Sequence, residues 1–270
     1  MSPSLSASDL FNVKSLVAVV TGGATGDVTS KADLEKVTKQ ISSEVGYINL
    51  LVANAGTTGP MFGDNISICG PDQSPLSDVQ RDLWNINPDL FLNTFATNIG
   101  GPFWSIVAFL PLLDAGNRKG NVLQSSQVVT TGSEAAYDRI PIPHYTYSAS
   151  KAGLTHMMKQ FATTFTRYKI RFNVIAPGRK PPSSVFCSDT RIMSNAAAVY
   201  PSELTAGFIA STENLSDDEK SSLVSPLQRP GNMEDMAGVI IWLASRAGAW
   251  VHGNVVLTDG GKISSVPATY

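Results

Sequence analysis

The sequence predicts an α/β domain built on a doubly wound parallel sheet. Short apolar runs rich in β-branched residues alternate with segments of helical spacing, as in successive βαβ units. The apolar runs end in small or polar residues, and ligands of such sheets bind beyond the carboxyl ends of the strands. The chain has 270 residues, of which 43% are hydrophobic, so it can bury a sizeable core. We expect one domain over residues 1–270.

Five strands are predicted from short apolar runs without polar alternation, the pattern of a parallel sheet that is covered on both faces. In chain order they are Leu16–Val20, Ile48–Ala53, a segment within Val122–Thr131, Ile170–Ala176 and Asn254–Thr258. Polar or glycine-containing stretches follow four of them. This places Thr21-Gly22, Asn54-Ala55-Gly56, Ser133 and Pro177-Gly178 at one edge of the sheet.

Four helices are predicted from apolar residues at helical spacing. They are Ser30–Glu44, Leu90–Leu113, Tyr147–Tyr168 and Glu234–Ser245. Ser30 and Asp33 are placed to form a capping box at the start of the first helix. Pro102 is expected to kink or break the second helix. In the third, the inward-facing residues are Leu154, Met157, Met158, Phe161 and Phe165. Residues 57–75 are rich in Gly, Pro, Asp and Asn and are expected to form a loop.

Charge, cysteine content and hydropathy exclude several classes of protein. Lys plus Arg is 20 and Asp plus Glu is 22, so no basic excess is present and nucleic acid is not an expected partner. Cys69 and Cys187 match no metal spacing and form no disulfide framework, which favours a reducing compartment. The run Pro102–Leu113 is too short to span a bilayer, and Met1–Ser15 has no signal-peptide pattern. We expect a soluble, cytoplasmic protein with no membrane partner and no metal.

Tyr147 and Lys151 are four residues apart, which places a phenol and an ammonium on one helix face. A neighbouring cation favours the phenolate, and this makes a phenol useful for acid–base catalysis near neutral pH. An ordinary surface pair is the alternative. The position at a helix start, just beyond a strand end, favours the catalytic interpretation.

Thr21-Gly22-Gly23-Ala24-Thr25-Gly26 follows the first strand and has the composition of a phosphate cradle. Glycines let backbone amides approach a pyrophosphate closely. The alternative interpretation of this run is a plain glycine-rich turn. Asn54-Ala55-Gly56, after the second strand, could equally be a plain turn.

Taken together, these motifs resemble those of the short-chain dehydrogenase/reductase family. The matches run from about Leu16 to Gly261: Thr21-Gly22-x-x-x-Gly26, Asn54-Ala55-Gly56, Asn98, Tyr147-x-x-x-Lys151, Asn173-x-x-x-Pro177-Gly178 and Asp259-Gly260-Gly261. The resemblance implies a Rossmann-like fold and an NAD(P)-dependent oxidoreductase that interconverts a small-molecule carbonyl and a secondary alcohol. NADP is slightly favoured over NAD from the family alone. The family also implies a homo-oligomer in which the Leu90–Leu113 and Tyr147–Tyr168 helices pair across a two-fold axis.

The resemblance also implies roles for individual residues. Tyr147 would be the acid–base group, Lys151 would favour its ionisation and hold the nicotinamide ribose, and Asn98 would hold a water that relays protons. Ser133, 14 residues before Tyr147, fits the family spacing for the substrate-binding serine better than Ser125 or Ser126, which lie 22 and 21 residues before it. The implied cofactor contacts are Gly22, Gly26, Asp27, Asn54, Ala55, Gly56, Tyr147, Lys151, Pro177, Gly178 and Thr205, with Ser202 as second candidate for the last.

The chain departs from the family pattern directly after Gly26. Asp27-Val28 resembles the adenine-side aspartate, so the helix behind the glycines, the next strand and the residues that select NAD or NADP are missing. In the family strand order 3-2-1-4-5-6-7, this loss removes strands 3 and 2 from one edge. Strand 1 would then reach strand 4 through residues 30–44 by a right-handed crossover. Strand ends two places apart are about 9.6 Å apart. The glycines or Asp27 must therefore leave their family position, or the loop between them must stretch.

A second departure is the insert Arg179–Val199, which lies between Pro177-Gly178 and Tyr200-Pro201. Its first residues are polar and proline-rich and are expected to form an extended loop. A substrate lid and altered exon joining are both open interpretations. Because the nucleotide-binding half is shortened, the alternative to an active enzyme is a catalytically impaired relative that acts through oligomer contacts.

Overall fold

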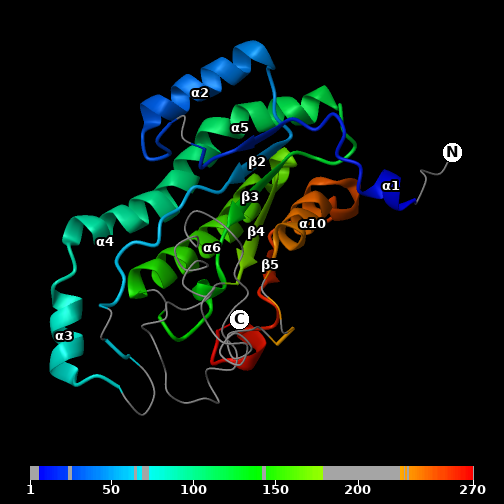
Figure 1. Ribbon diagram of the computed structural model, residues 1–270. Helices are drawn as coiled ribbons and strands as arrows, with labels where there is room; N and C mark the ends of the chain where they lie inside the picture. Colours follow the sequence, from blue (N-terminus) through cyan, green and yellow to red (C-terminus); the bar gives the residue numbers. More distant parts are fainter. Residues whose placement is uncertain are drawn as a thin grey trace.

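A computed structural model describes residues 6–23, 26–63, 66–68, 73–141, 144–178, 226–227, 229 and 231–269. A five-stranded sheet runs through its centre (Figure 1), and every pairing in it is parallel. In spatial order the strands are β1 (Ala18–Val20), β2 (Leu50–Ala53), β3 (Gln127–Thr131), β4 (Arg171–Pro177) and β5 (Val255–Thr258). The five predicted strands and the predicted fold class are confirmed.

β1 pairs directly with β2, with Ala18 opposite Leu50 and Val20 opposite Val52. The chain passes from one strand to the other through α2 (Lys31–Glu44). This is the arrangement expected when two edge strands are lost. Among the described residues no strand lies on the other side of β1, and the side chain of Val20 is left 62% exposed.

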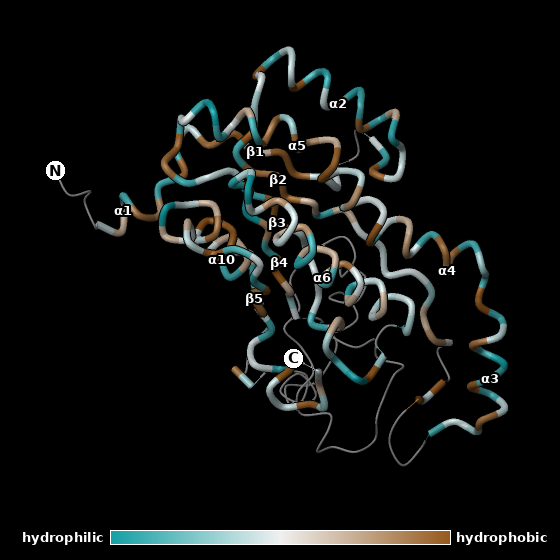
Figure 2. The backbone as a smooth tube through the Cα atoms, turned by 180° about the vertical axis from the view of Figure 1, so that it is seen from behind, coloured by the Kyte–Doolittle hydropathy of each residue, from teal (hydrophilic) through white to brown (hydrophobic). Residues whose placement is uncertain are grey.

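Helices cover both faces of the sheet. α2, α5 (Gly101–Lys119) and α6 (Tyr145–Phe165) pack on the face that carries Leu51, Val128 and Val174, while α10 (Met233–Ala244) packs on the face that carries Leu50 and Val129. Figure 2 shows hydrophobic colour on the strands and on α5, whereas α2 is mostly hydrophilic. Leu154, Met158 and Phe161 are buried as predicted, and Met157 and Phe165 are partly buried against the same core.

The predicted helix with a break near Pro102 is found as two helices joined by a π-helical turn. α4 (Pro88–Phe95) runs into the π turn Ala96–Gly100, and α5 follows. Pro102 lies in the first turn of α5, where its missing N–H is tolerated. The continuous stretch Pro88–Lys119 is long and apolar enough to cross a bilayer by length and composition, a test that core helices also pass. In its most apolar window, 44% of the residues are buried inside the protein.

Two helices were not predicted: α1 (Ala7–Leu10) and α3 (Leu76–Trp84). Neither helix contains a buried residue. α1 is only four residues long, whereas α3 carries Leu76, Val79 and Leu83 at helical spacing, a signal that could have predicted it. The remaining turns are 3-10 helices at Glu134–Ala136, Thr166–Tyr168, Arg246–Gly248 and Ile263–Ser265. The predicted capping box at α2 is half formed, because Ser30 Oγ accepts from Asp33 N whereas the Asp33 carboxylate accepts from Asp27 N.

The close approach of α5 to the start of β2 depends on a glycine. A methyl group on Gly116 would collide with the carbonyl oxygen of Ile48, whereas a methyl group on Gly238, in the exposed face of α10, would meet open space. Gly116→Ala is therefore expected to lower the free energy of unfolding by about 1–3 kcal/mol through overpacking. Gly238→Ala should raise it by about 0.5–1 kcal/mol, because alanine is the better helix former. Urea denaturation measures both, and equal effects of the two substitutions would contradict this packing.

Candidate active site

The carboxyl ends of β1, β2 and β3 are joined by side chains that the sequence places at this edge. Thr21 Oγ1 accepts hydrogen bonds from the backbone amides of Asn54 (3.0 Å) and Ala55 (3.2 Å). Thr131 Oγ1 donates to Asn54 Oδ1 at 2.9 Å. Gly22 adopts φ +107°, and a methyl group on it would lie 3.3 Å from Asn54 Nδ2. The first glycine of the predicted cradle and the Asn54-Ala55 pair therefore lie in contact.

Asn98 lies in the π turn between α4 and α5 and is fully buried. Its Oδ1 accepts from Thr57 N (2.8 Å), and its Nδ2 donates to Thr57 O (2.9 Å) and to Ser150 Oγ (2.9 Å). One amide side chain thus connects the loop after β2, the helix junction and α6. The π turn directs Asn98 inward, and the three hydrogen bonds fix its orientation.

Tyr147 and Lys151 lie in the first turns of α6, and both are buried. Lys151 Nζ donates to Thr131 O at 2.8 Å and lies 5.7 Å from the centre of the Tyr147 ring. A methyl group on Gly56 would lie 3.2 Å from Asn98 Oδ1 and 3.6 Å from Lys151 Nζ. The side chains of Asn98 and Lys151 therefore converge over Gly56, where the absence of a side chain leaves room.

Ser133 lies two residues after the end of β3 and is buried. Its Oγ accepts from Ala135 N at 3.2 Å, so it caps the 3-10 turn Glu134–Ala136, and that turn packs against α6. Ser125 and Ser126 precede β3 instead, at the opposite end of the strand. Ser125 O there accepts from the buried guanidinium of Arg171, whose pKa is lowered to about 10 by burial.

On the phosphate side of the site, the start of α2 is not open to an anion, because the chain's own carboxylates lie there. Asp27 N, which follows Gly26, donates to Asp33 Oδ2 at 2.9 Å, so a carboxylate of the chain occupies the start of α2. The pKa of Asp27 is lowered by hydrogen bonds from the Thr29 amide and hydroxyl, so a second negative charge lies beside it. Val28 packs against Gly101 at the start of α5. Ala24 and Thr25 lie outside the described residues.

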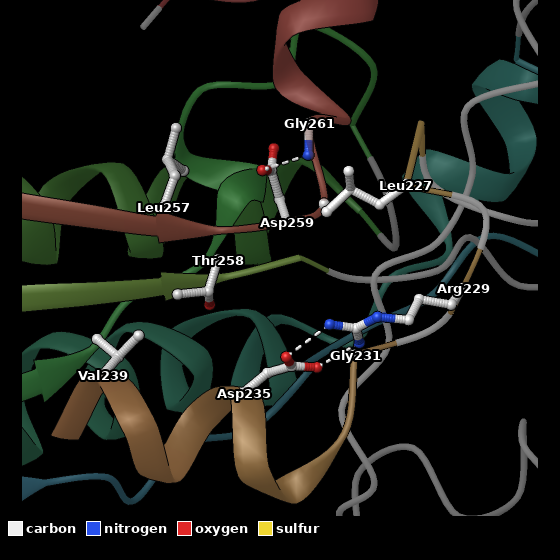
Figure 3. A pocket seen from close by; sticks show the side chains of 10 residues that line it. Leu227, Arg229, Gly231, Asp235, Val239, Leu257, Thr258, Asp259 and Gly261 are labelled. Carbon is white, nitrogen blue, oxygen red and sulfur yellow. Dashed lines mark hydrogen bonds and ion pairs between the residues drawn. The ribbon is translucent and has the colours of Figure 1, made fainter. Parts of the chain in front are cut away.

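On the other side of the site, Gly178 N donates to Thr258 O at 3.1 Å, which joins the segment after β4 to the end of β5. Thr205, Ser202, the insert 179–199 and both cysteines lie outside the described residues. Next to the end of β5, a cavity of ≈ 370 Å³ opens between this strand and α10 (Figure 3). Arg229 and Asp235 form an ion pair at its rim, and its described lining includes none of the predicted site residues. Among the described residues, no group of His, Cys, Asp and Glu is arranged to hold a metal.

His144, which the sequence analysis missed, caps α6 three residues before Tyr147. It is 2% exposed, its Nδ1 lies 3.4 Å from Thr146 N and 3.0 Å from Thr146 Oγ1, and its ring packs against Phe62. Burial lowers the pKa of His144, which favours the neutral ring. It lies three residues before the predicted helix start at Tyr147, and histidine is not among the preferred N-cap residues, so no sequence signal marked this role.

A buried ion cluster was also missed. Lys262 Nζ lies 2.8 Å from Glu134 Oε2 and 3.3 Å from Asp138 Oδ2, and at most 6% of each side chain is exposed. Burial acts to lower the pKa of Lys262, but the two carboxylates outweigh it and the pKa is raised. Glu134 directly follows Ser133, so the cluster borders the candidate site. In the sequence, Lys262 was marked only by its place directly after Asp259-Gly260-Gly261.

Comparisons with known proteins agree with this architecture. The family model described as short chain dehydrogenase matches residues 12–181. The chain is 48% identical over 314 aligned positions to short-chain dehydrogenase/reductase PhomF of Diaporthe leptostromiformis, covering 100% of this chain and 99% of that protein. It is 32% identical over 327 positions to short-chain dehydrogenase/reductase VdtF of Byssochlamys spectabilis, covering 98% of each. The first alignment is 44 positions longer than this chain of 270 residues, so residues present in that relative are missing here.

Among solved structures, the Pseudomonas aeruginosa RhlG/NADP active-site complex superposes with a TM-score of 0.62 at 26% identity. The match covers 88% of this chain and 75% of that one. Levodione reductase also has a TM-score of 0.62, at 21% identity, covering 89% of this chain and 76% of that chain. In both cases about a quarter of the larger protein has no counterpart here, which agrees with a sheet that lacks strands at one edge.

The buried His144 predicts a pH dependence of stability. Because its pKa is lowered in the folded state, the unfolded chain binds a proton that the native state excludes. The free energy of unfolding should therefore fall below about pH 6.5, by up to about 1.4 kcal/mol per pH unit. His144→Asn keeps a side-chain acceptor at the helix cap and should flatten this slope between about pH 7.5 and 5.5.

Urea denaturation at each pH measures the slope, and His156→Asn is the matched control because His156 is exposed on the same helix. A slope in His144→Asn equal to that of the wild type would contradict the assignment.

Proposed function

Because the chain belongs to the short-chain dehydrogenase/reductase family, we propose that it transfers hydride between a nicotinamide cofactor and a small carbonyl or secondary alcohol, with Tyr147 as the acid–base group. The observation that carries this proposal is that Asn98, from the π turn, and Lys151, from α6, both lie close to Gly56. Tyr147 lies one turn before Lys151 on α6. Two structural relatives are complexes with NADP or with NADH, which supports a nicotinamide cofactor in general.

The residues of the nicotinamide side fit such a cofactor. Lys151 Nζ and Asn98 Oδ1 both lie close to Gly56, so these two polar groups are near each other at the strand end that would receive the ribose. Lys151 is held by the carbonyl of Thr131, and Asn98 is held by Thr57 and Ser150, so both groups are oriented before a ligand arrives. Preorganised polar groups of this kind favour the bound geometry at little further cost.

The proposed chemistry divides between the cofactor and the chain. A bound nicotinamide supplies or accepts the hydride. Tyr147 gives a proton to the carbonyl oxygen during reduction and takes one from the alcohol during oxidation, and Lys151 lies on the next turn of the same helix. Ser133 would hydrogen-bond the substrate oxygen from the end of β3.

The adenosine side fits less well. A helix N-terminus binds phosphate through free amides and its positive dipole. Here Asp33 already accepts from Asp27 N, and two carboxylates lie at the start of α2. No residue of the described chain occupies the strand end that would read the ribose 2′ position. We therefore propose weak binding of dinucleotides, with poor discrimination between NAD and NADP.

The alternative function is a catalytically impaired relative that acts through contacts between subunits. The acidic start of α2 and the open edge of β1 favour it. Leu90, Phe91, Leu92 and Val107 are each at least 40% exposed on α4 and α5, which supports a homo-oligomer in either case. Measured turnover with any carbonyl substrate decides between the two functions.

Tyr147→Phe is expected to lower kcat by at least about 10²-fold, because it removes the group that transfers the proton. Tyr145→Phe is the matched control: Tyr145 is 52% exposed at the start of the same helix, and its loss of a hydroxyl should leave kcat unchanged. Steady-state kinetics measure both. Wild-type kcat in Tyr147→Phe would exclude this tyrosine as the acid–base residue.

Titration with NADH and NADPH should give dissociation constants weaker than the low-micromolar range and within about tenfold of each other. Because the residual contacts lie on the nicotinamide side, Lys151→Met should abolish binding, whereas Asp27→Asn should leave it within about twofold. Low-micromolar binding with a clear preference for one cofactor would show that the phosphate cradle is intact.

Static light scattering at micromolar concentration should give a mass above the 28.7 kDa of one chain. Burial of the exposed apolar residues of α4 and α5 against a second copy is the expected cause. A clean monomer over this concentration range would exclude the homo-oligomer.

A further inference from the structure

The Asp259-Gly260-Gly261 stretch after β5 folds into a tight turn that directs the next residue inward. Asp259 Oδ1 accepts from Gly261 N at 3.0 Å, as Figure 3 shows, and Oδ2 accepts from Ile263 N at 2.8 Å. Gly260 and Gly261 have φ of +61° and +89°, a conformation that favours glycine. The turn therefore needs these residue types, and its result is that Lys262 enters the protein interior.

Inside, Lys262 meets two carboxylates. Its Nζ lies 2.8 Å from Glu134 Oε2 and 3.3 Å from Asp138 Oδ2, and water has almost no access to any of the three side chains. Removing one partner from such a buried cluster leaves charge uncompensated, so the three groups hold one another firmly in place. The cluster joins two segments that are 128 residues apart in the chain.

The chain beyond Lys262 continues along the same loop. Arg139 N donates to Pro267 O at 3.1 Å, Thr269 N donates to Tyr137 O at 2.9 Å, and Asp138 and Ala268 form an antiparallel bridge. We call residues 262–269 the C-terminal strap. The strap lies over residues 134–139 and is fixed by the ion cluster at one end and by backbone hydrogen bonds at the other.

The strap reaches the candidate active site through Glu134. This residue follows Ser133, and Ser133 Oγ caps the 3-10 turn that Glu134 begins. The same turn packs against α6, which carries Tyr147. The distance between the serine and the tyrosine is therefore fixed from two sides, by α6 and by the strap.

We propose that Lys262 is a positioning residue: by binding Glu134 and Asp138, it anchors the C-terminal strap on the turn after Ser133 and holds this serine in register with Tyr147. The inference deepens the proposed function and rests on it, because it takes Ser133 as the group that binds the substrate oxygen. A small displacement of a substrate-positioning group lowers the rate strongly even when binding is retained. Apolar side chains of similar volume would stabilise the interior equally well, so the directed contacts of an ion cluster suit a positioning role.

The test compares four variants by amide hydrogen exchange and by kinetics. Lys262→Met removes the charge at similar length. Because it removes the cation that both buried carboxylates bind, the combined variant Lys262→Met, Glu134→Gln and Asp138→Asn removes all three charges together and guards against simple misfolding. Lys262→Arg restores the cation. Lys39→Met, in an exposed ion pair on α2, is the matched control.

Exchange is followed in residues 131–141, which contain the turn, and in β4, which reports on the sheet. We expect Lys262→Met and the combined variant to raise exchange in residues 131–141 by at least about tenfold and to leave β4 unchanged. The value of kcat should fall by at least about tenfold, while KM and cofactor affinity change by less than about threefold. Lys262→Arg should restore most of the exchange protection and most of kcat, and Lys39→Met should change neither exchange nor kcat.

Unchanged exchange in residues 131–141 would overturn the proposal, and so would an equal rise in β4, because the cluster would then serve stability alone. Unchanged kcat in a variant with raised exchange would overturn it as well. If the wild-type protein shows no turnover with any carbonyl substrate, the proposed function fails. Exchange alone then decides whether Lys262 holds the turn after Ser133.

Discussion

The direct pairing of β1 with β2 constrains the rest of this molecule. Ala18 to Val20 lie beside Leu50 to Val52, so the carboxyl end of β1 lies next to Asn54-Ala55. Thr21, directly after β1, accepts hydrogen bonds from the amides of both residues and so joins the two strand ends. The same pairing makes β1 an edge of the described sheet. A site at these strand ends keeps the side chains that follow β2, β3 and β4. It lacks the side chains that strands beyond β1 would place there.

Consequently the two halves of the site are unequal. The half formed by the π turn, α6 and the end of β3 is buried, hydrogen-bonded and held from outside by the C-terminal strap. The half formed by the glycine loop meets the start of α2, where the chain satisfies its own amide with a carboxylate. The alignment with the 48% identical relative is 44 positions longer than this chain, so that relative carries residues that are missing here.

The sequence was sufficient for the sheet, the helices that pack on it and the meeting of motifs at one edge, because apolar runs and parallel topology determine all three. The helix α3 was missed although Leu76, Val79 and Leu83 have helical spacing, because the segment directly follows a predicted loop. The π turn depends on Asn98 binding Thr57 and Ser150, 41 and 52 residues away, and no local pattern encodes such contacts. Lys262 was missed because a charged residue is expected at the surface unless its partners are known.

We propose that cofactor affinity comes from the nicotinamide half of the site alone. The most direct test compares the dissociation constants of reduced nicotinamide mononucleotide and of NADH for the wild-type chain. If the adenosine half contributes little, the two constants agree within about tenfold, which corresponds to ~1.4 kcal/mol. NADH binding more than about 100-fold tighter than the mononucleotide would contradict the account, because the missing strands would then not have removed the adenosine site.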